Sequence, residues 1–183
     1  MAVALLFAGV FGVKAGEPTA LDLIKEGNRY VGDPSKDKVV EITSEKSIGT
    51  LTPNIWYINY FDPDTKFKIT QVKFGGGQKM EVKRPWRMFK SQKVESDIFD
   101  LAKLDVDSDE AIKVAVSDPL LGKLTLKATQ LWLERLDGVP VWKVRLWAAK
   151  LNPPTESVNI GEVFVSAKEG KIVKTDLHIS RVD

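Results

Sequence analysis

The single histidine of this 183-residue chain, His178, is the first side chain to consider for chemistry, because imidazole is a common general base and metal ligand. Lys174 and Asp176 precede it at alternate positions, so in a strand the three side chains share one face, where solvent exposure is expected. One histidine cannot form a zinc site without further ligands, and the chain has no cysteine. No serine lies in a nucleophile-elbow motif. We therefore expect no catalytic residue and no enzyme activity.

Three aspartates, Asp105, Asp107 and Asp109, stand at alternate positions, as carboxylates do at the start of a calcium-binding loop. The rest of such a loop is missing, because its sixth position is Glu110 instead of glycine and its twelfth is Val116 instead of glutamate. Acidic residues also stabilise the first turn of a helix through the helix dipole. We expect helix capping here and no metal.

Three consecutive glycines, Gly75, Gly76 and Gly77, suggest a phosphate cradle, because backbone amides without Cβ atoms can surround an anion. A phosphate loop leads into a helix and contains a Lys-Ser or Lys-Thr pair. Residues 79–83 have instead the composition of a strand and contain no such pair. A hairpin turn accounts for the glycines, and no cofactor is expected.

A cluster of cations is interleaved with Trp86 and Phe89, and this combination of charge and stacking faces suits anionic ligands. Its members are Lys79, Lys83, Arg84, Arg87, Lys90 and Lys93. The formal net charge of the chain is only +2, which gives no general argument for nucleic acid. An anionic glycan or lipid is the candidate ligand of this cluster. Its contacts would be Lys83, Arg84, Arg87 and Lys90.

The hydrophobic content of 43% and the charged content of 28% predict a globular chain of one or two small domains. Residues 2–13 are apolar and are followed by Lys14 and Ala15, which is typical of a signal peptide cleaved after Ala15. The run is too short to cross a bilayer. It lacks a preceding basic residue, and a buried N-terminal helix is the alternative. We expect a periplasmic or secreted protein, not bound to nucleic acid and without stable membrane insertion after cleavage.

Residues 107–183 carry the clearest structural signals. Ser108 can cap a helix over residues 109–117, and Pro119 ends it, because proline disfavours helical geometry in the residue before it. The expected strands after the helix are residues 124–136, 139–149, 160–167 and 171–179. Asp137-Gly138 favours a tight hairpin turn between the first two. Alternation along the second strand places one set of side chains inward, namely Trp142, Val144, Leu146 and Ala148, and the other set outward, namely Lys143, Arg145 and Trp147.

The first half shows a weaker form of the same pattern. Residues 20–28 indicate a helix, and residues 55–61 alternate with Trp56, Ile58 and Tyr60 inward and with Tyr57, Asn59 and Phe61 outward. We therefore predict a tandem duplication, although two β-rich halves can also match by chance. The predicted fold class is α+β, with tandem small units that are each a short helix followed by a curled antiparallel β-sheet. The predicted division is a signal peptide at 1–15, a first unit at 16–84, a linker at 85–106 and a second unit at 107–183.

Three segments of the second unit carry a resemblance: residues 107–116 (DSDEAIKVAV), 137–146 (DGVPVWKVRL) and 163–177 (VFVSAKEGKIVKTDL). They resemble the PepSY family of small extracytoplasmic domains, in which a helix precedes a curled, cystatin-like antiparallel sheet. Ala167, Gly170 and Lys171 match the family's turn between two strands. The resemblance implies a place outside the cytoplasm and a binding or inhibitory role, since such domains accompany peptidase propeptides and sensor proteins. A tandem pair would also be similar in architecture to proteinaceous β-lactamase inhibitors.

The outward side chains of the sheet are the best candidates for a protein-binding surface, because aromatic and cationic groups anchor interfaces. They are Lys143, Arg145, Trp147, Tyr57, Asn59 and Phe61. The alternative is that the two outward faces pack against each other inside the monomer. We expect an exported, non-catalytic binding module of PepSY type that inhibits or regulates an extracytoplasmic peptidase. A structural or sensory envelope domain without inhibitory activity is the alternative function.

Overall fold

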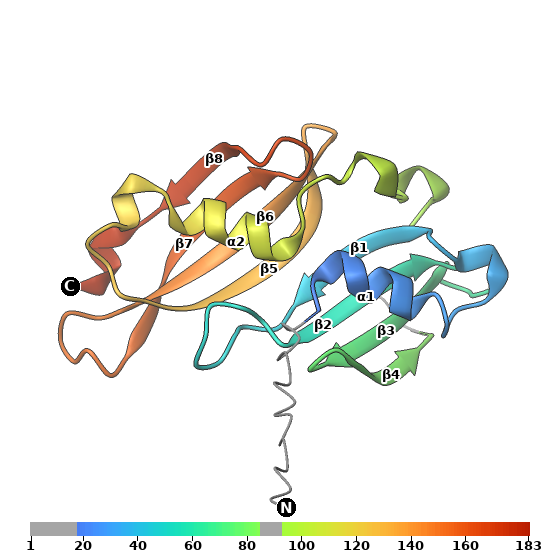
Figure 1. Ribbon diagram of the computed structural model, residues 1–183, viewed down its shortest axis with the longest axis horizontal. Coiled ribbons are helices and arrows are strands. Elements are labelled where there is room, and N and C mark those ends of the chain that lie inside the picture. Colours follow the sequence, from blue (N-terminus) through green and yellow to red (C-terminus); the bar gives the residue numbers. More distant parts are fainter. Residues whose placement is uncertain (1–17, 85–92) are drawn as a thin grey trace, which may run out of the picture.

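The computed structural model describes residues 18–84 and 93–183 (Figure 1). The elements of the first range are α1 (Ala20–Gly27), the 3₁₀ turn η1 (Asp33–Ser35), β1 (Val39–Ser44), β2 (Ile55–Phe61), β3 (Ile69–Gly75) and β4 (Gln78–Lys83). The elements of the second range are η2 (Glu95–Asp97), η3 (Leu101–Lys103), α2 (Ser108–Val116), η4 (Pro119–Leu121), β5 (Leu126–Leu136), β6 (Val139–Ala149), β7 (Ser157–Ser166), β8 (Ile172–Leu177) and η5 (Ile179–Val182). The predicted signal peptide, residues 1–15, lies outside the described residues.

All eight strands form one antiparallel sheet in the order β4-β3-β2-β1-β5-β6-β7-β8. The first four strands and the last four are joined by the pairing of β1 with β5, in which Ile42 lies opposite Leu133 and Thr43 lies opposite Trp132. The predicted fold class, tandem units that each carry their own curled sheet, is therefore wrong. The strands of residues 16–84 and of residues 107–183 belong to a single sheet.

Strand β1 joins the two groups of strands, and it is the element that sequence reasoning missed. Val39, Val40 and Ile42 are buried, and their β-branched side chains suit a pleated surface. Two separate sheets would each expose an edge of unpaired backbone N–H and C=O groups, one at β1 and one at β5. Pairing the two edges removes both, which is the physical reason for one sheet.

Serine hydroxyl groups extend the junction of β1 and β5 beyond its backbone ladder. Ser44 Oγ accepts a hydrogen bond from the buried N–H of Leu131 at 2.9 Å. Ser47 Oγ accepts one from the buried N–H of Thr129, also at 2.9 Å. The side chain of Gln130 donates to the carbonyl oxygen of Ser44 at 3.0 Å. The N–H groups of Leu131 and Thr129 on β5 thus have hydrogen-bond acceptors although they lie beyond the paired residues Leu133 and Trp132.

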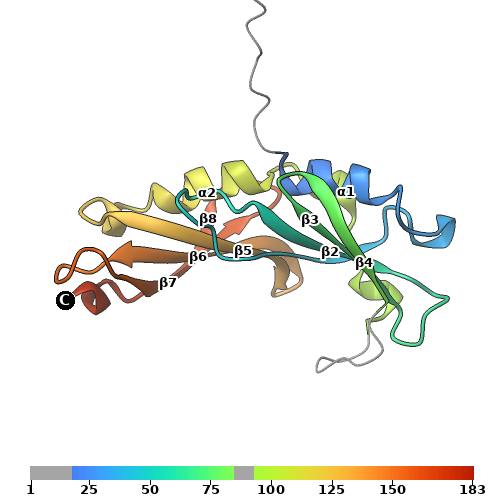
Figure 2. The same cartoon turned by 90° about the horizontal axis from the view of Figure 1, so that it is seen from below.

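Both α-helices lie on the same side of the sheet (Figure 2). They bury one face each, with Leu23 and Ile24 from α1 and Ala111 and Ile112 from α2, in a core shared with the sheet. The large sheet side chains that are fully buried include Tyr60, Phe74, Ile42, Ile58, Leu131, Leu133, Trp142 and Leu146. The inward phase predicted for β2 and β6 is confirmed, and one continuous core lies between the helices and the sheet.

The N-terminus of α1 is hydrogen-bonded to the side chains that begin α2. The N–H of Ala20 donates to Ser108 Oγ at 3.0 Å, and the N–H of Leu21 donates to Asp107 Oδ1 at 3.1 Å. Asp107 also accepts from the N–H of Ser108 and is the N-cap of α2. The predicted cap, Ser108, instead lies inside α2 and satisfies a free N–H of α1.

The hairpin predicted at Asp137-Gly138 is confirmed, and both residues have the positive φ angles that the dipeptide favours, 51° and 83°. The glycine triplet likewise lies in the tight turn between β3 and β4, where Gly75 pairs with Gln78. Within residues 18–84 and 93–183, no helix has the length and apolarity needed to span a bilayer.

Candidate protein-binding face of the sheet

Neither α-helix covers the second side of the sheet, which we call the open face (Figure 2). Residues directly opposite each other on neighbouring strands point to the same face, so the pairing register identifies the side chains that share it. One set of opposite residues runs through all eight strands, and we call it the central row. From β4 to β8 its members are Glu81, Lys73, Tyr57, Thr43, Trp132, Lys143, Phe164 and Lys174.

Cations lie over aromatic rings along the central row. The Nζ atom of Lys73 is 5.0 Å from the ring centroid of Tyr57, that of Lys143 is 4.9 Å from Trp132, and that of Lys174 is 5.2 Å from Phe164. Each contact is favourable by about 0.5–1 kcal/mol at an exposed site. The row is therefore an ordered set of rings and charges held by neighbouring strands.

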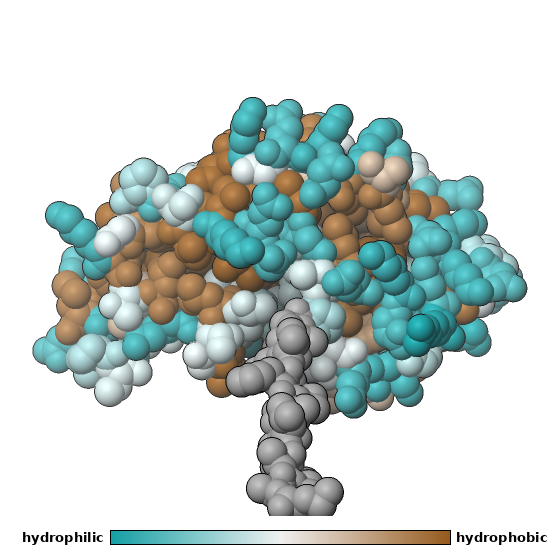
Figure 3. Space-filling view, viewed as in Figure 1, coloured by the Kyte–Doolittle hydropathy of each residue, from teal (hydrophilic) through white to brown (hydrophobic). Residues whose placement is uncertain are grey.

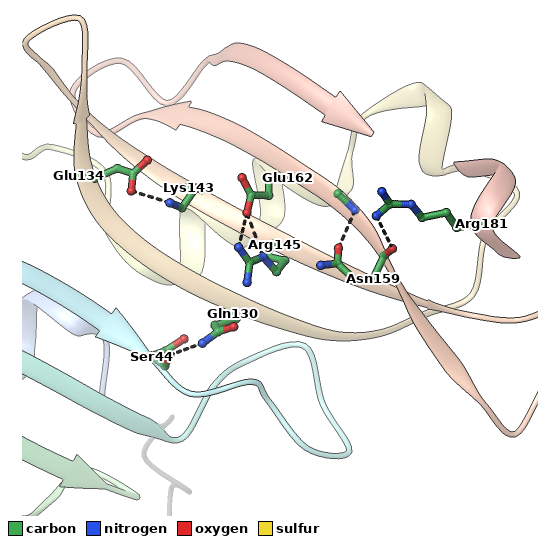
Figure 4. A network of polar contacts seen from close by, with 9 residues as sticks. Ser44, Gln130, Glu134, Lys143, Arg145, Asn159, Glu162 and Arg181 are labelled. Carbon is green, nitrogen blue, oxygen red and sulfur yellow. Dashed lines mark hydrogen bonds and ion pairs between the residues drawn. The ribbon is translucent and has the colours of Figure 1, made fainter. Parts of the chain in front are cut away.

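A second row lies beside the central row, two residues away from it on each of β5 to β8. Its members are Gln130, Arg145, Glu162 and Asp176. Arg145 donates from Nε and from a terminal nitrogen to Glu162 Oε1, at 2.9 and 2.6 Å (Figure 4). In the central row, Lys143 forms an ion pair with Glu134 at 2.6 Å (Figure 4). These pairs neutralise most of the charge near the centre of the open face and fix the direction of the side chains.

All six residues predicted for protein binding belong to β2 and β6, and the register places Tyr57 and Lys143 in the same row. The two outward faces are thus one continuous surface and do not pack against each other. Asn59 and Phe61 are buried, with exposed fractions of 6% and 9%. Asn59 donates to Glu41 at 2.7 Å and accepts from Gln71 at 2.9 Å. These two residues support the face rather than present contact area.

Trp147 lies near the C-terminal end of β6 and is half-buried. The Nζ atom of Lys46 lies 4.6 Å from its ring centroid. Within the part of the chain that the structure describes, no carboxylate lies within ion-pair distance of Lys46. The same holds for Arg181, whose side chain donates only to the carbonyl oxygen of Asn159 at 3.3 Å (Figure 4). Two cations of the open face, Lys46 and Arg181, are thus without a carboxylate partner among the described residues.

Glu45, Tyr57 and Lys73 form a polar cluster on the open face. Tyr57 donates its hydroxyl hydrogen to Glu45, and Lys73 Nζ lies 3.2 Å from the same carboxylate oxygen. The hydrogen bond from Tyr57, together with the ammonium group of Lys73, holds the pKa of Glu45 below its usual value. Hydrogen bonds to Tyr57 and Glu45 raise the pKa of Lys73. Both groups are charged at neutral pH.

The other candidates for chemistry are dispersed. His178 follows β8 and lies 3.4 Å from Asp176, with about half of its side chain exposed (51%). Asp107 caps α2, as described above. Within residues 18–84 and 93–183, no group of three or more histidine, aspartate and glutamate side chains is arranged to hold a metal ion.

Two hollows in the described surface also lack an arrangement typical of an active site. A groove of about 660 Å³ is lined by Gly49, Thr50, Leu51, Leu126, Lys127, Pro154, Thr155 and Ser157. Its only ionisable lining group is Lys127. A smaller hollow of about 220 Å³ lies beside Arg145, Asn159, Gly161, Glu162, Asp176, His178 and Arg181. Arg145 and Glu162 are paired with each other in this hollow, Asp176 lies 3.4 Å from His178, and Arg181 has no carboxylate within ion-pair distance among the described residues.

The cation cluster predicted for an anionic glycan or lipid is described only in part, because Arg87 and Lys90 lie outside the described residues. Lys83 forms an ion pair with Glu81 at 2.8 Å, and Arg84 lies 3.9 Å from Asp62. Each of these two cations thus has a carboxylate neighbour, which lowers its attraction for an external anion.

Sequence reasoning missed the open-face residues that lie on the strands between β2 and β6, and on β7. Trp132 and Phe164 are the main ones. The ring of Trp132 lies under Lys143, which was predicted, and the ring of Phe164 lies under Lys174, which was not assigned to the binding surface. The alternation of side chains along β5 and along β7 could have indicated which of them lie on the same side of each strand. The register that aligns them in one row cannot be read from either strand alone.

Comparison with models of protein families, with curated proteins and with solved structures found no match in any of the three.

Proposed function

We propose that this protein is an extracytoplasmic, non-catalytic binding module that recognises a partner protein through the open face of its sheet. The observation that carries the proposal is the central row, in which rings and cations from neighbouring strands lie on a face that neither α-helix covers. Aromatic residues are enriched at protein interfaces, and the central row contains Tyr57, Trp132 and Phe164. Because strands and ion pairs hold these side chains in place, little ordering entropy is lost on binding.

Two cations of the open face are available to acidic groups of a partner surface. Lys143 and Arg145 are neutralised within the face, whereas Lys46 and Arg181 have no described carboxylate partner. Aspartate or glutamate side chains of a partner would complement these two cations. An extracytoplasmic peptidase is the partner class that the PepSY resemblance implies, and inhibition or regulation of that peptidase is the proposed consequence.

A structural or sensory envelope domain is the second candidate function. The observation in its favour is that many charges on the open face are paired internally, as in Lys73 with Glu45 and Arg145 with Glu162. Such pairs stabilise the surface without an external ligand.

The test measures the affinity for a partner protein, because capture of a partner alone does not locate the binding surface. A partner recovered from the envelope of the source organism is purified, and its dissociation constant is measured for the wild type and for the double variant Lys46→Glu/Trp147→Ala. We expect binding at least about thirtyfold weaker for the double variant, the scale of a central interface residue. Binding of the wild type should also weaken as salt is raised, because the contact is partly electrostatic.

The matched control is Lys113→Glu, which makes the same charge change on α2, on the helix side. It should leave the dissociation constant unchanged. Equal losses for the control and the double variant would contradict a site on the open face, and so would wild-type affinity for the double variant. A partner whose own activity is unaffected by saturating binding would favour the structural or sensory alternative.

A further inference from the structure

Strand β8 is one edge of the sheet, and within the described residues it pairs with β7 alone. Its residues from Ile172 to Asp176 are exposed. The N–H of His178 donates to the carbonyl oxygen of Ile160 on β7 at 2.7 Å. Because backbone groups alternate in direction along an antiparallel strand, Lys174 and Asp176 also direct theirs toward β7. Thr175 and Leu177 therefore direct theirs outward, where another strand can pair with them.

The sequence of β8 is self-complementary about Thr175. An antiparallel pair of two β8 strands centred on this residue places Lys174 opposite Asp176 of the second copy, and Asp176 opposite Lys174 of the second copy. It also places Val173 opposite Leu177 of the second copy, twice by symmetry. In such a pair Thr175 lies opposite its own equivalent, with outward backbone groups on both strands. Opposite charges and apolar residues at opposite positions stabilise a strand pair.

The electrostatic environment of Asp176 favours a further cation. Asp176 lies directly opposite Glu162 on β7, and like charges at opposite positions destabilise a pair. Arg145 compensates Glu162, whereas Asp176 has only the His178 side chain at 3.4 Å. Lys174 has a ring contact with Phe164 and no described carboxylate partner. The second copy would provide both missing partners.

The opposite edge, β4, differs because two of its charges are already paired within the strand. Lys83 forms an ion pair with Glu81 at 2.8 Å, so a second copy would supply no missing partner to Glu81, as it would to Lys174 and Asp176 of β8.

Apolar surface also reaches the β8 edge. Val173 is 50% exposed and Ile172 is 36% exposed. Viewed from the helix side, apolar residues are visible around α2 and the strands beneath it (Figure 3). We propose that two copies of this chain associate through antiparallel pairing of their β8 strands about Thr175, which joins two eight-stranded sheets into one.

The test is the oligomeric state of the full chain, measured by analytical ultracentrifugation over a range of protein concentrations. We expect a reversible dimer of the wild type. Lys174→Glu and Asp176→Lys each replace two attractive contacts by two repulsive ones and should weaken the dimer at least about tenfold. The double variant Lys174→Glu/Asp176→Lys restores opposite charges and should recover dimerisation. Circular dichroism confirms that each variant is folded.

Lys168→Glu, in the turn between β7 and β8, is the charge-matched control and should dimerise like the wild type. A wild type that stays monomeric at the highest concentration overturns the proposal. The proposal is also overturned if neither single variant weakens the dimer, because such a dimer would use another surface. Recovery in the double variant is the result that separates pairing through β8 from a general effect of surface charge.

Discussion

Trp142 connects the sheet to the segment that precedes α2. Its side chain is fully buried, and its Nε1 atom donates to the carbonyl oxygen of Val106 at 2.9 Å. The N–H of Val106 in turn donates to the carbonyl oxygen of Ala167 at 3.0 Å. The indole N–H of Trp142 and the carbonyl oxygen of Ala167 therefore both hold the segment that leads into α2.

Trp142→Phe should lower the free energy of unfolding by about 1–3 kcal/mol, because the buried carbonyl group of Val106 loses its donor. Denaturant unfolding measures this loss. Trp147→Phe makes the same chemical change at a half-buried position on the open face, where no indole N–H hydrogen bond is described, and it should cost less than about 0.5 kcal/mol. Similar losses for both variants would refute this role of the indole N–H.

Glu45 makes the stability of the protein depend on pH. Its folded-state pKa lies below the usual value of 4.5 because of Tyr57 and Lys73. A carboxylate with a lowered pKa contributes stability above its unfolded-state pKa, and this contribution is lost as pH falls through the folded-state pKa.

Glu45→Gln should therefore lower the melting temperature slightly at neutral pH, and the difference from the wild type should shrink as the pH falls below about 4.5. Thermal unfolding at a series of pH values measures the difference. Because the carboxylate is about half exposed, the effect is expected to be small. A difference that grows in acid would contradict the assignment.

At the scale of elements, the junction of β1 and β5 depends on side chains as much as on the backbone. Ser44→Ala leaves the buried N–H of Leu131 without its acceptor, so we expect a loss of about 1–3 kcal/mol in the free energy of unfolding. Ser117→Ala, which removes a hydroxyl hydrogen bond at the exposed end of α2, should cost less than about 0.5 kcal/mol. Chemical denaturation of both variants compares the two losses directly.

Elements bounded by residues with a strong conformational preference were predictable from the sequence. A two-residue hairpin turn requires positive φ angles, which Asp137 and Gly138 tolerate, so the turn and the start of β6 at Val139 were predicted correctly. Strand β1 is short, and its irregular step between Val39 and Glu41 interrupts simple alternation. Without β1, nothing in the sequence indicated that β2 and β6 share a sheet, and the fold was divided into two units.

The candidate site was predictable at the level of single strands. Alternation correctly placed Lys143, Arg145 and Trp147 away from the core. It also placed Phe61 outward, although tertiary packing buries that side chain. The alignment of Tyr57 with Trp132 depends on a strand pairing between distant segments, which local patterns do not encode.

At the scale of the whole molecule, the continuous sheet and core predict a single cooperative unfolding transition. Native-state hydrogen exchange should give similar free energies of opening for the central amides of β3 and β7. Ser44→Ala should lower both values by the same amount, because the junction belongs to one cooperative unit. Loosening of β3 with unchanged protection in β7 would show instead that the two groups of strands unfold separately.

The hydrogen bonds from Ala20 and Leu21 to Ser108 and Asp107 also affect how the chain folds during its synthesis. When residues 18–84 have left the ribosome, the first turn of α1 still lacks these acceptors, and β1 still lacks β5. The nascent first half is therefore an incomplete structure with an open strand edge, and that edge is a site for aggregation. Chaperone protection would be needed most between the emergence of β1 and the emergence of residue 136.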